Sequence, residues 1–323
     1  MNNTLVQIGE VLKGAKSIYL FPHTNADGDA MGSCAALCIV LRKLGKECYI
    51  LIEDDIADNL KFMDKGYTTF DPETIKEPDI CMCVDCGEID RFPTRKETFL
   101  KGKIKACIDH HITSKHFADY NYIDPEAAAT GEIIFKLIKA MNVEIDKETG
   151  EAIFAAITTD TGNFQYSNTH KESFEIMVEL MNSQIDINSV SNAIYQNCPL
   201  EQFVIKNMVM DTMEIFADGQ SVIVYVTQEM LKKSNAKMEH TEGLIGELRG
   251  IKGVEISAFL KENEEGKIKV SMRAKSYADV AAICQKYAGG GHIKAAGCTL
   301  EMDMKSAIEL MKSEITASFK ESK

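Results

Sequence analysis

Three side chains that commonly bind metal ions are crowded into seven residues near the start of the chain. The segment supplies one imidazole and two carboxylates, His23, Asp27 and Asp29, directly after the apolar run Ser17 to Phe21. Gly28 lies between the two aspartates and lets the backbone turn without a Cβ penalty. Imidazole nitrogen and carboxylate oxygen together suit a divalent cation such as Mn²⁺, Mg²⁺ or Zn²⁺. The alternative is an Asx-rich turn that caps the following helix.

Other ligand-type residues follow later apolar segments. They are Asp85 after Ile80 to Val84, Asp109-His110-His111 after Ile104 to Ile108, and Asp160 in Thr159-Asp-Thr-Gly-Asn163, after a helix pattern that ends at Thr158. Because parallel strands end at one edge of a sheet, we expect these groups to converge there. Unpaired carboxylates at such an edge would repel one another and lose hydration. For the two histidines the alternative is a hydrogen-bonded core pair.

The charges of these residues suggest two metal ions. Asp27, Asp29, Asp85 and Asp160 carry four negative charges, which two divalent cations neutralise. A site without net charge does not repel a phosphate. Two adjacent metal ions can bridge a hydroxide and clamp phosphoryl oxygens for in-line attack. The residue set therefore predicts hydrolysis of a phosphoester.

The elements that must hold these residues alternate between strands and helices. The expected strands are Ser17 to Phe21, Cys48 to Ile52, Ile80 to Val84 and Ile104 to Ile108, and the expected helices are Asn3 to Leu12, Ala30 to Leu44, Ala127 to Met141, Lys147 to Thr158 and Ser173 to Met181. Continuous apolar strands that alternate with helices predict an α/β domain with a parallel sheet and helices on both faces.

The pattern changes in the last third of the chain. A helix is expected from Pro199 to Met213, followed by strands at Ser221 to Val226, Val254 to Leu260 and Lys267 to Met272. The length of 323 residues also favours two domains. We expect a catalytic domain at residues 1–190, a linker helix at 191–213 and a smaller α/β domain at 214–323.

Composition narrows the class of ligand and the compartment. The formal net charge of −13 disfavours a protein that grips long duplex nucleic acid, and it favours a short anionic ligand. No apolar run approaches the length of a membrane span, so no membrane partner is expected. Ten cysteines scattered among apolar residues indicate reduced thiols and a cytoplasmic location. Cys83 and Cys86 form a C-x-x-C pair at a strand end, which does not favour a redox or zinc role.

The ordered motifs carry a family resemblance. The series H-x-x-x-D-x-D, a strand-end Asp, D-H-H, T-D-T-G-N and, far downstream, G-G-G-H-x-x-A-A-G resembles the DHH/DHHA1 phosphoesterases over nearly the whole chain. The compact length is similar to that of the nano-RNase members, which degrade short oligoribonucleotides and dephosphorylate 3′-phosphoadenosine 5′-phosphate. Ala26 stands where many members carry proline, and it is not a ligand.

The resemblance implies a set of roles. One metal would be held by His23, Asp27 and Asp85, and the second by Asp29, Asp85, His110 and Asp160, with Asp85 as the bridge. Asp109 and His111 would be catalytic: Asp109 would orient the neighbouring imidazole and His111 would reach the phosphate or the leaving oxygen. The cofactors would be two divalent ions, Mn²⁺ first, with Mg²⁺ or Co²⁺ as alternatives.

The smaller domain contains a glycine-rich loop that resembles the family's substrate loop. Gly289, Gly290, Gly291 and His292 would bind substrate, with backbone N–H groups forming a nest for an anion. It is not a P-loop, because no G-K-[ST] follows, and the alternative is an ordinary turn. The following Ala295-Ala296-Gly297 would let a helix pack behind the loop. Arg273 is the candidate for a terminal phosphate or a base, with a solvated surface arginine as the alternative. Arg91 and Arg249 are not assigned.

The sequence thus predicts a two-metal phosphoesterase, a hydrolase similar to 3′–5′ oligoribonucleases. Its substrates would be short single-stranded RNA, 3′-phosphoadenosine 5′-phosphate or both, held between the domains and attacked by a metal-bridging hydroxide. A homodimer is left open. Alternatives are a phosphodiesterase of linear or cyclic dinucleotides such as pApA, a pyrophosphatase-like enzyme, and a nucleotide-binding regulator without catalysis.

Overall fold

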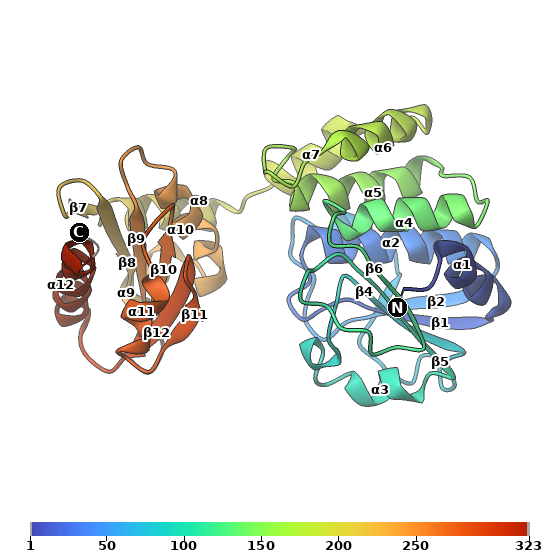
Figure 1. The fold of residues 1–323 in the computed structure, drawn as a ribbon, viewed down its shortest axis with the longest axis horizontal. Helices are drawn as coiled ribbons and strands as arrows, with labels where there is room; N and C mark the ends of the chain where they lie inside the picture. The colour runs from blue at the N-terminus through green and yellow to red at the C-terminus, as the bar shows by residue number, and fades with distance from the viewer. Residues whose placement is uncertain (1, 322–323) are drawn as a thin grey trace. The chain divides into compact units, whose positions relative to one another are not determined.

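The computed structural model describes residues 2–321 and shows two compact units, which divide after Asn197. The helix that we expected as a linker, α8 (Leu200–Met210), packs inside the second unit through the buried side chains of Ile205 and Val209. Each unit is built on one six-stranded sheet (Figure 1).

The first unit is a parallel sheet with the strand order β3-β2-β1-β4-β5-β6. Its strands are β1 (Ser17–Phe21), β2 (Glu47–Leu51), β3 (Thr68–Thr69), β4 (Ile80–Val84), β5 (Ile104–Asp109) and β6 (Tyr120–Ile123). Its helices are α1 (Leu5–Gly14), α2 (Gly28–Lys43), α3 (Lys96–Lys101), α4 (Thr130–Ala140), α5 (Lys147–Asp160), α6 (Lys171–Asn182) and α7 (Ile187–Tyr195), with short 3₁₀ turns η1 (Lys61–Met63) and η2 (Ile89–Arg91).

Both faces of this sheet are buried, which explains why its central strands are apolar throughout. In β4, Ile80, Met82 and Val84 join the core under α2, α4 and α5, whereas Cys81 and Cys83 join a second core that includes Phe92 and Phe99. Figure 1 shows α2, α4 and α5 layered on one face of the sheet and α3 on the other.

The strand order reverses at β1, which pairs with β2 on one side and with β4 on the other. In parallel sheets this reversal opens a crevice at the carboxyl ends of the strands. The loops that leave β1, β4 and β5 therefore meet at one edge.

The helices over this edge approach closely through glycines. A Cβ atom at Gly32 would lie 2.6 Å from the carbonyl oxygen of Ala152, and one at Gly131 would lie 2.6 Å from the Cβ of Ala156. A Cβ at Gly28 would lie 2.4 Å from side-chain atoms of Thr159. Helices α2 and α4 are thus packed onto α5 at distances that only glycine permits.

The second unit has a mixed sheet with the strand order β11-β12-β10-β9-β8-β7, in which only β8 and β9 pair in parallel. Its strands are β7 (Glu214–Phe216), β8 (Ser221–Val226), β9 (Ile256–Glu262), β10 (Ile268–Ala274), β11 (Gly290–His292) and β12 (Ala295–Leu300). Besides α8 its helices are α9 (Gln228–Ser234), α10 (Leu244–Arg249), α11 (Val280–Gln285) and α12 (Met304–Glu321), with the 3₁₀ turn η3 (Met238–Thr241).

The expected α/β fold, with a parallel sheet first and a smaller α/β unit second, is confirmed. One local expectation is wrong, because α4 begins at Thr130, three residues later than expected. Ala295 to Gly297 begin strand β12, and helix α11 packs against β11 and β12, as expected of a helix behind the glycine loop. Over the described part of the chain, none of the helices has the length and apolar character needed to span a membrane.

Candidate metal centre

The loop after β1 both caps a helix and presents ligands. Asp27 is the N-cap of α2, and its Oδ1 accepts hydrogen bonds from the backbone N–H groups of Asp29 and Ala30, both at 3.1 Å. The capping turn and the metal-binding hypothesis are therefore compatible. The other carboxylate oxygen of Asp27 lies 3.8 Å from His23 Nε2.

His23 is oriented by its own neighbour in sequence. Its Nδ1 lies 2.8 Å from the carbonyl oxygen of Thr24, so Nδ1 carries the hydrogen and donates it. Nε2 is then a lone-pair nitrogen, and it faces carboxylate oxygens of Asp27 and Asp85, each at 3.8 Å.

His110 is oriented in the same way, but by a distant residue. Its Nδ1 lies 3.1 Å from the carbonyl oxygen of Ala127, at the approach to α4. Its Nε2 faces three carboxylates, at 3.5 Å from Asp160, 3.7 Å from Asp29 and 3.8 Å from Asp85.

Asp85 stands between the two histidines. It follows β4 with φ of 58°, a left-handed backbone that costs energy for a residue other than glycine and is often found at functional sites. One of its oxygens faces His23 and the other faces His110. The oxygen nearer His110 also accepts a hydrogen bond from Thr130 Oγ1 at 2.8 Å.

Asp29 is buried in the first turn of α2 and is held by the amino end of α4. The backbone N–H groups of Thr130 and Gly131 donate to its two oxygens at 2.7 and 2.9 Å. Ser33 donates a further hydrogen bond at 3.0 Å. The free N–H groups of a helix start stabilise a carboxylate in this position.

The electrostatics of the cluster favour a bound cation. Burial, together with the charges of Asp85 and Asp160, raises the pKa of Asp29 well above its usual value. Burial, together with Asp27, raises the pKa of Asp85 to about 6, and burial also raises that of Asp160. When both rings are neutral, the Nε2 lone pairs of His23 and His110 face these oxygens at 3.5–3.8 Å, too far for hydrogen bonds. Burial would lower the pKa of His23, but Asp27, the carbonyl of Thr24 and Asp85 raise it overall, so its Nε2 attracts a proton or a metal ion. The residues therefore fit divalent cations.

Three sets of ligand atoms lie close enough to share an ion. They are His23 with Asp27 and Asp85, Asp29 with His110 and Asp160, and Asp85 with His110 and His111, and within each set the ligand atoms lie within 4.8 Å of one another. Seven of the eight catalytic and metal-binding candidates of the first unit thus meet at one edge of the sheet, and the eighth, Asp109, is hydrogen-bonded to one of them, His111.

His111 and Asp109 form a pair beside this cluster. His111 Nδ1 donates to the buried Asp109 carboxylate at 2.8 Å. This hydrogen bond raises the pKa of His111 to about 9. Burial alone would raise the pKa of Asp109, but the hydrogen bonds from His111 and from Ser114 lower it overall. His111 is 40% exposed, so the ring is accessible.

Comparison with known proteins agrees with this arrangement. The DHH family, N-terminal domain, matches residues 17–157, and the DHHA1 domain matches residues 219–321. A bifunctional oligoribonuclease and PAP phosphatase NrnA of Thermus thermophilus is 32% identical over 305 residues, which cover 94% of this chain and 90% of that protein. The chain belongs to the DHH family. The resemblance inferred from the motifs, and with it the class of phosphoesterase hydrolases, is confirmed.

One further relative and two solved structures match the chain over a similar extent. The NrnA of Bacillus subtilis with the same two activities in its name is 25% identical over 291 residues, covering 88% of this chain and 89% of that protein. The crystal structure of an exopolyphosphatase-related protein from Bacteroides fragilis has a TM-score of 0.87 at 26% identity, covering 96% of this chain and 94% of that one. The exonuclease RecJ bound to manganese, with a TM-score of 0.56 at 13% identity, covers 98% of this chain and 94% of that one and shares the fold.

The DHHA1 domain contains the remaining candidates, Arg273, Gly289, Gly290, Gly291 and His292. Arg273 is the sixth residue of β10, and its Nη1 donates to the carbonyl oxygen of Met272 at 3.0 Å. Arg273, Gly289 and Gly290 line an open hollow of about 630 Å³, and His292 is exposed.

Two glycines of this loop are needed for close backbone packing, a reason that was not expected from the sequence. A Cβ at Gly289 would lie 2.3 Å from the carbonyl oxygen of Gly297, and one at Gly291 would lie 2.4 Å from that of Ala295. The glycines therefore let β11 approach β12. The expected anion nest is wrong for Gly289, whose N–H donates to the carbonyl oxygen of Cys284.

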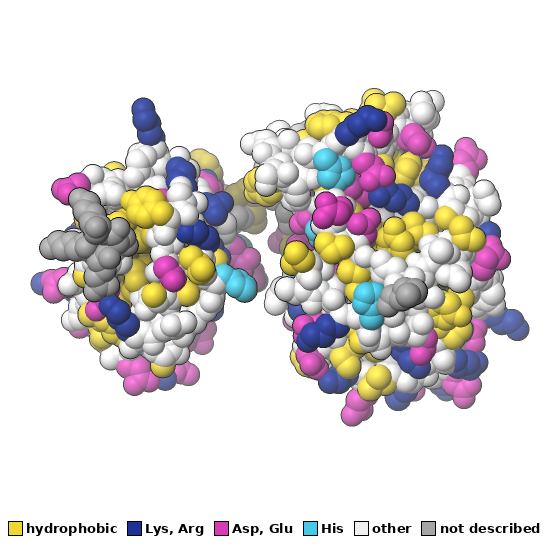
Figure 2. All heavy atoms as spheres, in the orientation of Figure 1, with side chains coloured by type: hydrophobic (Ala, Val, Ile, Leu, Met, Phe, Trp, Pro, Cys, Tyr) yellow, Lys and Arg dark blue, Asp and Glu magenta, His cyan; other side chains and the backbone are white. Residues whose placement is uncertain are grey.

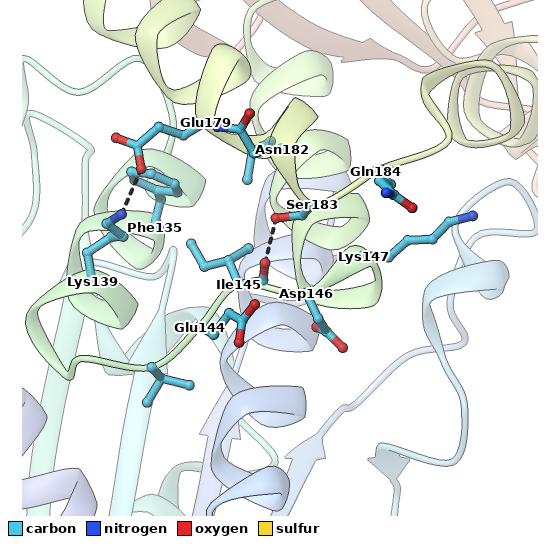
Figure 3. A pocket seen from close by; sticks show the side chains of 12 residues that line it. Phe135, Lys139, Glu144, Ile145, Asp146, Lys147, Glu179, Asn182, Ser183 and Gln184 are labelled. Atoms are coloured by element: carbon cyan, nitrogen blue, oxygen red, sulfur yellow. Dashed lines mark hydrogen bonds and ion pairs between the residues drawn. The ribbon is translucent and has the colours of Figure 1, made fainter.

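A hollow of about 470 Å³ elsewhere in the DHH unit is not part of this centre (Figure 3). It lies at the carboxyl ends of α4 and α6, and two contacts join groups of its lining to one another. Lys139 binds Glu179 at 2.7 Å, and Ser183 donates to the carbonyl oxygen of Ile145 at 2.5 Å. None of the metal-binding candidates lines it.

The groups that orient the ligands were not predicted from the sequence. These are the carbonyl oxygens of Thr24 and Ala127, the hydroxyls of Ser33, Thr130 and Ser114, and the N–H groups of Thr130 and Gly131. Backbone groups have no sequence signal of their own. Because a helix was expected to begin at Ala127, the turn before α4 was not predicted.

Proposed function

We propose that this protein hydrolyses short oligoribonucleotides and 3′-phosphoadenosine 5′-phosphate with two divalent cations, Mn²⁺ first. The observation that carries the proposal is the pair of lone-pair imidazole nitrogens, His23 Nε2 and His110 Nε2, each facing carboxylates at 3.5–3.8 Å. The names of the Thermus and Bacillus relatives supply the two substrate classes.

Each cation has its own set of ligands in this proposal. His23, Asp27 and Asp85 would hold one ion, and Asp29, Asp85, His110 and Asp160 would hold the other, so Asp85 would serve both. Divalent cations bound there would supply Lewis acidity toward the phosphoryl group. The four carboxylates balance the charge of the two ions, so the anionic substrate meets no net repulsion.

His111 is the proton donor in this proposal. Its Nδ1 is held by Asp109, which leaves Nε2 as the nitrogen available to substrate. With a pKa of about 9 the ring holds a proton at neutral pH and can donate it to a phosphate or leaving oxygen. In the DHHA1 domain, Arg273 and His292 bind the far end of the substrate.

The cytoplasmic location is also part of the proposal. All ten cysteines are free thiols, and nine of them are buried. This usage supports a reducing compartment. The homodimer considered above stays a prediction.

The proposal is tested with a hydrolysis panel in Mn²⁺. The panel contains 3′-phosphoadenosine 5′-phosphate, pApA, ribonucleotides of two to six residues, a cyclic dinucleotide, pyrophosphate and an RNA of more than twenty residues. We expect kcat/KM to be highest for two to four residues and for the bisphosphate, and to vanish after EDTA treatment. Turnover of pyrophosphate alone, or of none of these compounds, would contradict the proposal.

Chain length and salt add a second measurement. The net charge is −13, and Figure 2 shows acidic side chains interspersed with Lys and Arg over the visible face. A long strand would meet this acidic surface, so its rate should fall further at low salt, where repulsion is least screened. A rate that rises with length would indicate a processive nuclease instead.

A further inference from the structure

Glu132 is a completely buried carboxylate that no ligand set includes. It lies in the first turn of α4, with 0% of its surface exposed. Its Oε2 accepts a hydrogen bond from the backbone N–H of Ala128 at 3.1 Å. Its Oε1 has no hydrogen-bond partner among the described residues. His170 Nε2 lies 3.6 Å from the same Oε2 and forms an ion pair with it when the ring is protonated, but Oε1 stays unpaired. Burying an unpaired carboxylate oxygen costs stability, so a role in stabilising the fold explains only part of the residue.

Asn168 binds the carbonyl group of Ala128, the residue whose N–H group donates to Glu132. Its Nδ2 donates to the carbonyl oxygen of Ala128 at 2.9 Å and also to that of Asp160 at 3.2 Å. The N–H and the C=O of Ala128 are thus fixed by two side chains that lie 36 residues apart in the sequence. Asn168 at the same time connects Ala128 to the backbone of a metal-ligand candidate.

The segment that they hold positions three ligands. Ala127, one residue before Ala128, accepts the hydrogen bond from His110 Nδ1. Two residues after Ala128, Thr130 donates to Asp85 through its hydroxyl and to Asp29 through its N–H. A shift of the Ala128 backbone would move all of these contacts together.

The capping of α4 shows why the segment needs this support. The N-cap residue Ala129 has no side chain that can accept a hydrogen bond from the helix. The first-turn N–H groups of Thr130 and Gly131 are used on Asp29. Glu132 therefore fixes the turn before the helix, where an ordinary cap is missing.

We propose that Glu132 and Asn168 are positioning residues for the ion of Asp29, His110 and Asp160. They clamp Ala128 and thereby set the direction of His110 Nε2 and the place of Asp29. The ion of His23 depends less on the clamp, because the carbonyl oxygen of Thr24 orients that ring and Asp85 is the one ligand of this ion that the clamped segment contacts. The inference rests on the proposed function, since it concerns the second of the two proposed ions.

The test is a titration of EDTA-treated full-length protein with Mn²⁺ alone, followed by calorimetry and by the electron paramagnetic resonance signal of coupled Mn²⁺ pairs. We expect two binding events in the wild type. Glu132→Ala and Asn168→Ala should each weaken one event by about 10- to 100-fold, the usual effect of removing a group that orients a ligand. The other event should change much less, since it shares Asp85 alone with the clamped segment, and the coupled signal should weaken at limiting Mn²⁺.

Two further variants separate positioning from loss of stability. Glu132→Gln keeps an oxygen for the N–H of Ala128 and should bind both ions as the wild type does. Asp64→Ala removes a carboxylate that accepts the N–H groups of Gly66, Tyr67 and Thr68 in the same unit. It should lower the melting temperature and leave both binding events intact.

The outcomes distinguish the inference from the function on which it rests. A wild type that binds fewer than two Mn²⁺ ions overturns the proposed function and the clamp with it. A wild type that binds two, with Glu132→Ala and Asn168→Ala unchanged or with both events weakened equally, overturns the clamp alone. If Glu132→Ala does not fold, Asn168→Ala decides. The double variant should be no weaker than the single ones, because both act through Ala128.

Discussion

The buried Glu255 of the DHHA1 unit and the metal-ligand aspartates of the DHH unit have opposite electrostatic surroundings. In the DHHA1 unit, Glu255 is 5% exposed, and its oxygens accept hydrogen bonds from the N–H groups of Ser276, Tyr277 and Ala278 at 2.7–3.1 Å. Burial would raise the pKa of Glu255, but these N–H groups lower it overall. In the DHH unit, Asp29, Asp85 and Asp160 face one another, and their pKa values are raised.

The opposite direction of these pKa shifts distinguishes a carboxylate that stabilises the fold from carboxylates that are placed to bind a ligand. Backbone donors satisfy Glu255 within the protein, so its charge is stable there without help. The aspartates of the DHH unit keep part of their charge uncompensated, and that uncompensated charge is what a cation neutralises. Each substitution that follows changes either the candidate metal centre of the DHH unit or the DHHA1 unit.

The largest effect is expected for Asp85→Asn. Asparagine accepts the left-handed backbone of residue 85, but it removes the charge that faces both histidines. Activity should fall by at least about 100-fold, and binding of both ions should weaken. EDTA should inactivate the wild type and Mn²⁺ should restore it. Near-normal turnover of the variant at micromolar Mn²⁺ would rule out a bridging ligand.

Arg273→Ala and His292→Ala should affect substrate and not metal. A lost charge-assisted hydrogen bond to phosphate corresponds to about 10- to 100-fold in kcat/KM. Two Mn²⁺ ions should remain bound, as measured by metal analysis after gel filtration. If the metal content falls with the activity, the division of roles between the two domains is wrong.

Glu255→Ala should destabilise the DHHA1 unit by about 2–3 kcal/mol, because three buried N–H groups lose their acceptor. The folded pKa of Glu255 is lowered, so its contribution is present above the ordinary glutamate pKa and is lost as the pH falls through the folded value. Urea unfolding at several pH values should show the difference from wild type shrinking in acid. A difference that is constant with pH would indicate lost packing, not lost charge.

The smallest effect, of opposite sign, is expected for Asp160→Asn without metal. Removing one of the facing carboxylates relieves repulsion, and since the side chain is 32% exposed, solvent reduces the gain. The metal-free protein should therefore be more stable by less than about 1 kcal/mol. With Mn²⁺ the order should reverse, because the wild type gains more from binding. Thermal melts with EDTA and with Mn²⁺ measure the stability difference between variant and wild type in each condition. A clear loss of stability in EDTA would show that Asp160 is satisfied by the fold.

Much of the centre could be predicted because its ligands follow long apolar segments. The bounds of β1, β4 and β8 agree with the expected ones, since continuous apolar runs of five or six residues specify buried strands. The ligands come directly after such segments, so their convergence followed from the topology of a parallel sheet.

The missed parts depend on contacts between distant residues. Strands β3 and β11 are two and three residues long and have no apolar run, because partner strands and not their own side chains define them. The contacts of Thr130 with Asp29 and Asp85 join residues 101 and 45 positions apart. The pattern of Ala127 to Ala129 favours a helix by composition, whereas in the structure these residues precede α4 and the carbonyl oxygen of Ala127 orients His110.

The glycine contacts between α2 and α5 have a consequence for how the centre can change during evolution. Gly32 lies one turn after Asp29, against the backbone of α5, the helix that ends at Asp160. Alanine at position 32 would force the two helices apart, because the atoms in its way belong to the main chain. The packing of α2 on α5 therefore sets the separation of two candidate ligands, Asp29 and Asp160. A substitution at position 32 in a related protein would change this separation, and with it the size of ion that fits, without replacing any ligand.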